Sequence, residues 1–277
     1  MRFRIQHETH YRYSAPVVFA PHVLRLNPRA QSVEVLSRAL VVHPQPAELF
    51  DFDDAFGNRV SRVTFQSSPS DALRVESRLE LETFVAPDAG SDDGLPALPW
   101  PAPVGDGLDV YRYEADGDAS VRDFAGTVAA GAGRRPLAFL EALNASLFES
   151  MTAHVRHEGA AQRPGTTLAT RRGACRDITV LFLAACRSQG IPARFVSGYH
   201  ARTQTRDGQR YLHAWAEAFV PGRGWSGWDP THGLRAADGH VALCAAPEQA
   251  DTMPVEGGFY GNAQTSTLDW SLRIATD

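Results

Sequence analysis

Apolar and polar residues alternate approximately in the first part of the chain, which is the pattern of a β-strand with one buried face. Three such runs, rich in Val, Leu and Thr, extend from Arg4 to Tyr13, from Val33 to Val42 and from Leu73 to Phe84. Turn-forming pairs such as Asn27-Pro28 separate the runs. Strands at this spacing are typical of an antiparallel sandwich, so we expect a β-sandwich domain over residues 1–86.

A segment rich in Pro, Gly and Asp, residues 87–109, interrupts this pattern. Proline lacks a backbone N–H and glycine loses much entropy on ordering, so regular structure is not expected there. We interpret the segment as a linker that leads to a second domain over residues 110–277.

Helical patterns come first in the second domain, and strand-like patterns follow. Leucines recur every three or four residues in the middle helix, and Gly190 followed by Pro192 ends the last one. The expected helices extend over Ser120–Ala130, with Ser120 as N-cap, Arg135–Thr152 and Cys175–Gln189. The expected strands extend over Arg194–Tyr199, Tyr211–Val220, Trp225–Asp229, Val241–Ala245 and Thr267–Ile274.

Composition and charge narrow the classes of function. Of the 277 residues 43% are apolar and 21% charged, as in a soluble globular protein. The net charge is −5 and the basic residues are scattered, so nucleic acid is not expected as a partner. Because no apolar run is long enough to span a bilayer, no membrane partner is expected either. Three cysteines do not make a disulfide framework and no secretory signal is apparent, so we expect a cytoplasmic protein with reduced thiols.

Cys175 is the first candidate for chemistry, because it opens a strongly apolar helix after the pair Gly173-Ala174. The unpaired N–H groups and the positive dipole end at a helix start favour the thiolate, which is the nucleophilic form of cysteine. Gly173 permits a close backbone approach just before the helix. A buried structural cysteine is the simpler alternative, and we apply that interpretation to Cys186 and Cys244.

A thiolate that acts on amides also needs a base that can protonate the leaving amine. His213 lies in a run with the period of a strand, and Asp229 ends the next strand at an Asp-Pro pair. The turn from Val220 to Gly224 predicts a hairpin, which would bring His213 close to Asp229. A carboxylate in this place accepts a hydrogen bond from the imidazole and fixes its tautomer.

Four motifs in this region resemble those of the transglutaminase-like core family. In order, they are GACRD, GIPARFVSGY, HAW and DPT, and they contain Cys175, His213 and Asp229. The N-terminal segments HETHYRYSAPV, HVLRLNPR and DAFGNRV resemble the β domain that precedes this core in bacterial proteins. Towards the C-terminus, the segment around Cys244 departs from the usual G-R-D-Y-x-D-V pattern of the group.

The resemblance implies a papain-like α+β core behind an N-terminal antiparallel β-sandwich. It implies that Cys175 is the nucleophile, His213 the base and Asp229 the orienting carboxylate. The implied reaction is acyl transfer on amide or peptide bonds of a protein or peptide substrate, through a thioester. Hydrolysis is favoured, and transamidation to an amine stays open. No cofactor is expected, and no metal, because the chain has no calcium loop of the D-x-D-x-D-G type.

Two other classes of function also stay open. A non-catalytic binding module could retain the same fold, although an intact Cys-His-Asp set argues against this class. A metal site made of Cys175, His200 and His213 is the other, but these residues lack the paired spacing of typical ligand motifs.

The remaining side chains near the motifs have structural interpretations. Asp177 complements the helix dipole, and His200 and His232 are expected to form local hydrogen bonds. An oxyanion hole needs a second donor beside the backbone N–H of Cys175, and the segment Gln162 to Thr167 could supply it. Aromatic core positions are expected at Trp215, Trp225 and Trp228.

Overall fold

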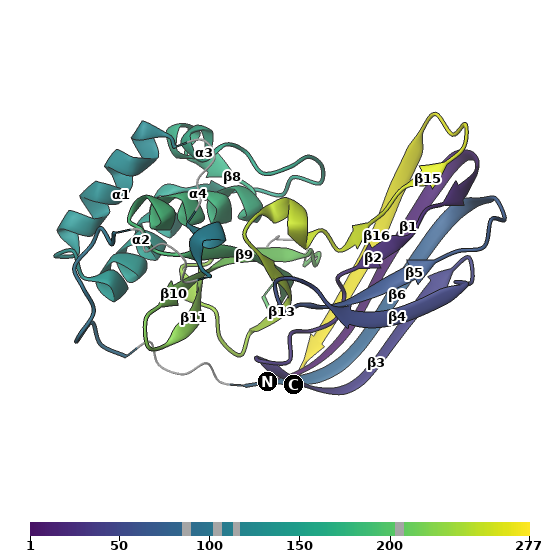
Figure 1. Cartoon of the computed structure of the whole chain (residues 1–277), viewed down its shortest axis with the longest axis horizontal. Helices are drawn as coiled ribbons and strands as arrows, with labels where there is room; N and C mark the ends of the chain where they lie inside the picture. Colours follow the sequence, from purple (N-terminus) through teal and green to yellow (C-terminus); the bar gives the residue numbers. More distant parts are fainter. Residues whose placement is uncertain (85–89, 102–106, 113–116, 203–207) are drawn as a thin grey trace.

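The computed structural model describes residues 1–84, 90–101, 107–112, 117–202 and 208–277. Figure 1 shows a β-sandwich on one side and, on the other, a part that combines helices with a further sheet. The two termini lie next to each other, and Arg2 and Asp277 exchange backbone hydrogen bonds there. Among the described helices, none is both long and apolar enough to cross a bilayer.

Two antiparallel sheets form the sandwich, because alternate residues of their strands face one apolar core. Phe3 and Leu81 come to this core from one sheet, and Leu24 and Val63 from the other. The first sheet has the order β16 (Ser266–Thr276), β1 (Arg2–Phe19), β6 (Ser70–Thr83) and β3 (Val33–His43), and β15 (Phe259–Tyr260) pairs with the far end of β1. The second sheet has the order β14 (Val255–Glu256), β2 (His22–Leu24), β5 (Arg59–Thr64) and β4 (Glu48–Asp53). The antiparallel N-terminal region expected from the sequence is therefore confirmed.

The C-terminal end of the chain returns to the sandwich. β16 pairs with β1 from Phe3↔Thr276 to Tyr13↔Ser266, and β14 pairs with β2. The domain boundaries expected from the sequence place β14 and β16 in the second domain, residues 110–277. In the structure both strands instead pair with strands of the sandwich. The physical reason is that β1 is long and would otherwise present one unpaired edge, which β16 covers.

The second part is organised around α4 (Cys175–Ser188), an apolar helix whose Leu181 and Phe182 are fully buried. The sheet beside it has the order β12 (Leu234–Arg235), β11 (Gly224–Asp229), β10 (His213–Val220), β9 (Ala193–His200) and β13 (His240–Ala246). The other helices are α1 (Ala119–Gly131), α2 (Pro136–Ser150) and α3 (Pro164–Thr170). Short elements complete this part: β7 (Thr152–Ala153), β8 (Arg172–Gly173), η1 (Asp109–Tyr111) and η2 (Gln249–Thr252). This mixed architecture agrees with the expected α+β core.

The N-terminus of α1 differs from the expectation in its capping residue. Asp118, not Ser120, is the N-cap, and the Asp118 carboxylate accepts the backbone N–H of Ser120. The carboxylate of Asp118 accepts from the same unpaired N–H groups that a Ser120 hydroxyl would cap. Its negative charge also complements the positive end of the helix dipole, which a neutral hydroxyl does not.

The expected linker, residues 87–109, lies partly outside the described residues. Its described part is irregular, as expected, but it packs against the helices. Leu98 is buried, and the backbone N–H of Trp100 donates to the carbonyl of Gln189 at 2.9 Å. These contacts attach residues 90–101 to the helical part.

The sandwich packs directly against the sheet of the second part. Tyr199 and Leu243 belong to the apolar core of the sandwich although they lie on β9 and β13. Asn58 is fully buried between the two parts, and its side chain exchanges hydrogen bonds with the backbone of Ala245 at 2.8 and 3.0 Å. This contact between the two parts places one face of the sandwich beside the start of α4.

Candidate active site

Cys175 occupies the first turn of α4, where backbone N–H groups have no partner within the helix. Gly173 before it allows the chain to turn closely into the helix, because a Cβ there would lie 2.8 Å from the Cβ of Asp177. The side chain of Cys175 is partly exposed, whereas Cys186 and Cys244 are buried. Burial raises the pKa of the Cys186 and Cys244 thiols, as expected for core residues.

Asp177 holds the segment before α4 against the start of the helix. Its carboxylate is fully buried and accepts the backbone N–H of Ala174 at 2.7 Å and that of Gln162 at 2.8 Å. It also forms an ion pair with Arg156 at 2.6 Å. Asp177 therefore does more than complement the helix dipole, because it ties the chain that precedes Cys175 to the first turn of α4. Both the backbone N–H and the side-chain amide of Gln162, the first residue of the segment that could supply the second oxyanion donor, donate to Asp177.

Replacing Asp177 by alanine is expected to lower the free energy of unfolding by about 3 to 5 kcal/mol, because it leaves the Arg156 charge and two backbone donors without their buried acceptor. Urea unfolding followed by circular dichroism measures this loss. The control is Asp118→Ala, which removes a partly exposed carboxylate at a helix start and should produce a much smaller loss. Equal losses in the two variants would contradict the role assigned to Asp177.

His213 and Asp229 meet across the hairpin of β10 and β11. The register pairs Val220 with Gly224 and Ala216 with Trp228, so the expected hairpin is present. Nε2 of His213 lies 2.8 Å from an Asp229 carboxylate oxygen. Cys175 lies close enough to the His213 ring for its charge and hydrogen bonding to raise the pKa of the imidazole. Because Nε2 is engaged by Asp229, Nδ1 is the nitrogen that remains for the sulfur, and the three predicted side chains form one continuous chain of contacts.

Charge and burial act in opposite directions on this pair. Burial lowers the pKa of His213, but the charge and hydrogen bond of Asp229, together with Cys175, outweigh it and raise the pKa to about 10. Burial likewise raises the pKa of Asp229, but His213 and further histidines outweigh it and hold that pKa well below its ordinary value. The pair is therefore an imidazolium and a carboxylate at neutral pH, which places a cation beside the sulfur of Cys175.

Two further histidines share the Asp229 oxygen that His213 uses. Nδ1 of His232 lies 2.7 Å from this oxygen and Nε2 of His240 lies 3.1 Å from it. The other carboxylate oxygen accepts the backbone N–H groups of Thr231 and His232 at 3.0 and 3.3 Å. Five hydrogen bonds thus hold the Asp229 carboxylate in place. Sequence reasoning missed His240, because only the pairing of His240 with His200 across β13 and β9 brings it to the site.

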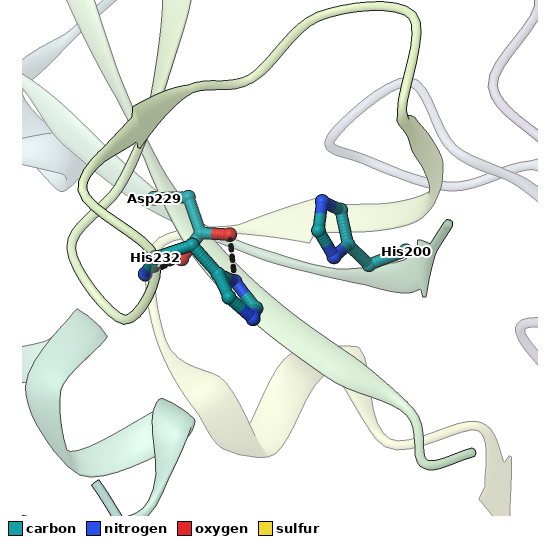
Figure 2. A group of neighbouring side chains, drawn as sticks. All are labelled: His200, Asp229 and His232. Atoms are coloured by element: carbon teal, nitrogen blue, oxygen red, sulfur yellow. Dashed lines mark hydrogen bonds and ion pairs between the residues drawn. The ribbon is translucent and has the colours of Figure 1, made fainter. Parts of the chain in front are cut away.

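His200 completes a cluster of imidazoles around Asp229. Its ring centroid is 4.6 Å from that of His232 and 4.3 Å from that of His240. Figure 2 shows His200 beside His232 and Asp229, with His232 hydrogen-bonded to the carboxylate. Among the described residues, two groups of ligand atoms lie within 4.8 Å of one another: His200, Asp229 and His232, and His213, Asp229 and His240. Neither group contains Cys175, so the structure does not assemble the metal site considered from the sequence.

The expected aromatic residues differ in their burial. Trp215 and Trp228 are fully buried, as expected for core positions. Trp225 is only partly buried, and the guanidinium of Arg194 lies 4.1 Å above its ring. Trp215 also lies beside the site, with its ring stacked on that of His213 at a centroid distance of 6.1 Å. It therefore restricts the imidazole from one side.

A cavity of about 630 Å³ opens beside Cys175 and His213, between the sandwich and the second part. Its walls are mainly apolar, and they include Tyr11 from β1, Trp270 and Leu272 from β16, and Tyr211. The sequence pattern did not predict this wall, because β1 and β16 reach Cys175 only through long-range pairing. A cavity of about 660 Å³ between residues 90–97 and the start of α2 lies elsewhere and contains none of the three predicted side chains.

Comparisons with known proteins cover both parts of the chain. Residues 3–82 match the family model of the bacterial transglutaminase-like N-terminal region, and residues 122–230 match that of the transglutaminase-like superfamily. An uncharacterised protein of Mycobacterium tuberculosis is 27% identical over 292 positions, which cover 99% of this chain and 92% of the relative. An uncharacterised protein of Mycobacterium leprae is 24% identical over 286 positions, which cover 99% of this chain and 98% of the relative.

One solved structure shares the fold over the whole length. It is a candidate cysteine protease from Cytophaga hutchinsonii, with a TM-score of 0.70 and 19% sequence identity, covering 100% of this chain and 92% of that chain. At this level of identity the likeness concerns the arrangement of both parts in space.

Proposed function

We propose that the chain catalyses acyl transfer from amide or peptide bonds through a cysteine nucleophile, because residues 122–230 match the transglutaminase-like superfamily and residues 3–82 match the bacterial N-terminal region. The observation that carries this proposal is the chain of contacts from Cys175 through His213 to Asp229. The non-catalytic alternative does not explain why a partly exposed thiol at a helix start lies beside a histidine. Nor does it explain why a buried carboxylate holds that histidine in place.

In the proposed reaction the sulfur of Cys175 attacks the amide carbonyl carbon and forms a C–S bond. The C–N bond breaks as His213 gives its proton to the leaving amine, which leaves a thioester on Cys175. The backbone N–H of Cys175 supplies one donor for the oxyanion. Water then attacks the thioester while His213 takes its proton, the C–S bond breaks, and the acid leaves. Hydrolysis is the outcome we propose, and an amine that replaces water would give transamidation.

The cavity beside Cys175 supports a peptide substrate with a large apolar side chain near the bond that is cleaved. Its aromatic and aliphatic walls, with Tyr11, Tyr211 and Trp270, bury apolar surface, and Arg156 and Arg176 line the cavity beside them. Tyr211 and Trp270 are in ring contact with a centroid distance of 4.9 Å. In this proposal the sandwich forms one wall of the substrate site.

Alkylation of the wild-type protein with iodoacetamide at pH 6 is expected to modify Cys175 first, ahead of the buried Cys186 and Cys244. His213→Ala should slow the modification of Cys175 about tenfold or more at pH 6, because the ring favours the thiolate, and the difference should shrink towards pH 9. Peptide mapping by mass spectrometry gives the rate for each cysteine. An unchanged rate at pH 6 in His213→Ala would remove the basis of the proposal.

A peptide library with the wild-type protein then tests the reaction itself. We expect cleavage next to large apolar residues, with acid and amine as products. A fluorescent primary amine added to the same mixtures separates the outcomes, since its incorporation into product identifies transamidation. Products without any preference for apolar side chains would contradict the assignment of the cavity wall.

A further inference from the structure

We propose that His200, His232 and Asp229 form a binding site for a transition-metal ion of the Zn²⁺ type, and that this ion inhibits the enzyme by competing for the carboxylate that holds His213. The three ligand atoms lie within 4.8 Å of one another. Two imidazole nitrogens and one carboxylate oxygen, with a water as fourth ligand, are a donor set that Zn²⁺ accepts readily. Binding does not depend on the proposed activity, whereas inhibition does.

His200 offers a nitrogen that its surroundings do not use. The side chain is buried, and its Nδ1 accepts the backbone N–H of Arg202 at 3.3 Å. Among the residues that the structure describes, none forms a hydrogen bond with Nε2 of His200. Because Nδ1 accepts, the neutral ring carries its proton on Nε2. Metal binding requires this proton to move to Nδ1, which gives up the contact with Arg202, and Nε2 then offers its lone pair to the ion.

His232 provides the second nitrogen and the access route. Its Nδ1 points to the Asp229 oxygen at 2.7 Å, and its side chain remains 15% exposed, whereas Asp229 is fully buried. An ion can therefore enter from the solvent side of His232. On binding, the proton on Nδ1 moves to solvent or to Nε2, and the nitrogen lone pair then faces the metal.

The other group of three ligand atoms is less suited to a metal. Nε2 of His240 binds Asp229, and its Nδ1 accepts the backbone N–H of Ala237 at 3.3 Å, so both nitrogens are used. All three residues of that group, including His213, are buried. The geometry therefore favours the group that contains His200 and His232 (Figure 2).

The distances require only a local adjustment. The ligand atoms of a tetrahedral Zn²⁺ lie about 3.3 Å apart. The hydrogen-bonded pair of His232 and Asp229 therefore opens slightly, and His200 moves inward from a position within 4.8 Å of the other two ligand atoms. The Asp229 oxygen that would bind the metal is the one that accepts from His213. A doubly charged ion on this oxygen weakens the bond to His213 and repels the imidazolium. The ion therefore inhibits the enzyme because it binds the Asp229 oxygen that holds His213 in place.

Zn²⁺ titration of the full chain, monitored by competition with a chromophoric chelator, tests the site. We expect about one equivalent of Zn²⁺ to bind the wild-type protein and also Cys175→Ala, because the catalytic thiol is not a ligand. His200→Phe keeps an aromatic ring in the stack but removes the nitrogen, and it should weaken binding at least about 10- to 100-fold. His232→Asn should do the same. Ca²⁺ and Mg²⁺, which prefer oxygen ligands, should not compete.

His157→Phe is the matched control, because it removes a histidine that lines the cavity beside Cys175 and leaves the cluster intact. Its affinity for Zn²⁺ should equal that of the wild-type protein. Resistance of Cys186 and Cys244 to alkylation verifies that each variant is folded. Absence of Zn²⁺ binding to the wild-type protein would overturn the inference. So would loss of binding in Cys175→Ala combined with full binding in His200→Phe, since the ion would then sit on the thiol. A chain that binds Zn²⁺ through His200 but cleaves no peptide would contradict the proposed function and leave the site standing.

Discussion

Cys175→Ala is expected to lower kcat/KM for the best peptide of the library by about 10⁴-fold or more, because removing the nucleophile eliminates the thioester route altogether. The loss should appear in kcat, whereas KM should change little, since Cys175 is only one of many residues that line the cavity. The partly exposed position of Cys175 at a helix start means that the substitution leaves no cavity in a tightly packed core. Steady-state kinetics on the purified protein gives both constants.

Cys186→Ala and Cys244→Ala are the matched controls for this experiment. Both thiols are fully buried, so their truncation acts on packing and should lower the free energy of unfolding by about 1 kcal/mol. Their kcat/KM should remain within a few-fold of the wild-type value. Turnover that survives in Cys175→Ala, or that disappears in Cys186→Ala at unchanged folding, would assign the chemistry to another group.

The elements that sequence predicted well are those with local signals. The start of α4 at Cys175 follows a glycine and opens an apolar run, and the hairpin that brings His213 to Asp229 is encoded by a turn of a few residues. Short-range patterns of this kind specify a helix end or a strand register without reference to the rest of the chain. The contacts among the three predicted side chains follow from these two local structures once α4 packs against β10.

The features that sequence did not predict depend on pairing between distant segments. His240 reaches Asp229 only because β13 pairs with β9, and the sandwich lines the cavity beside Cys175 only because β16 pairs with β1. No short pattern encodes which distant strand will cover an edge, because the energy of that choice comes from side chains on both partners. The four-histidine cluster is invisible in sequence for the same reason. Its members come from β9, β10, β13 and the loop after β11.

The cluster also gives a reason for the unusual surroundings of Asp229. Three histidine nitrogens approach one carboxylate oxygen, and two backbone N–H groups bind the other. Such a set holds the carboxylate ionised and prevents its rotation. A carboxylate that cannot rotate keeps the imidazole of His213 in one orientation, which proton transfer at the sulfur requires.

Asp229→Asn is expected to lower kcat/KM by about 10²- to 10⁴-fold, because an amide of nearly the same shape cannot accept hydrogen bonds from three imidazoles and carries no charge. The amide group also presents an N–H to one of these nitrogens, which selects the wrong tautomer of His213. Without the charge and hydrogen bond that raise it to about 10, the pKa of His213 should fall, since burial alone lowers it. Titration of the His213 ring by NMR measures this fall directly.

His10→Gln is the control for Asp229→Asn, because His10 lies on β1, outside the described cluster around Asp229, and its replacement should leave the titration of His213 unchanged. The thiol remains in place in Asp229→Asn, so alkylation of Cys175 reports on the same loss by a second route. The rate at pH 6 should fall towards that of His213→Ala, because an imidazole that gives up its proton no longer stabilises the thiolate. If Asp229→Asn retained both the raised pKa of His213 and the wild-type rate of alkylation, another group would have to hold the ring, and the three-residue chain of contacts would not be the source of reactivity at Cys175.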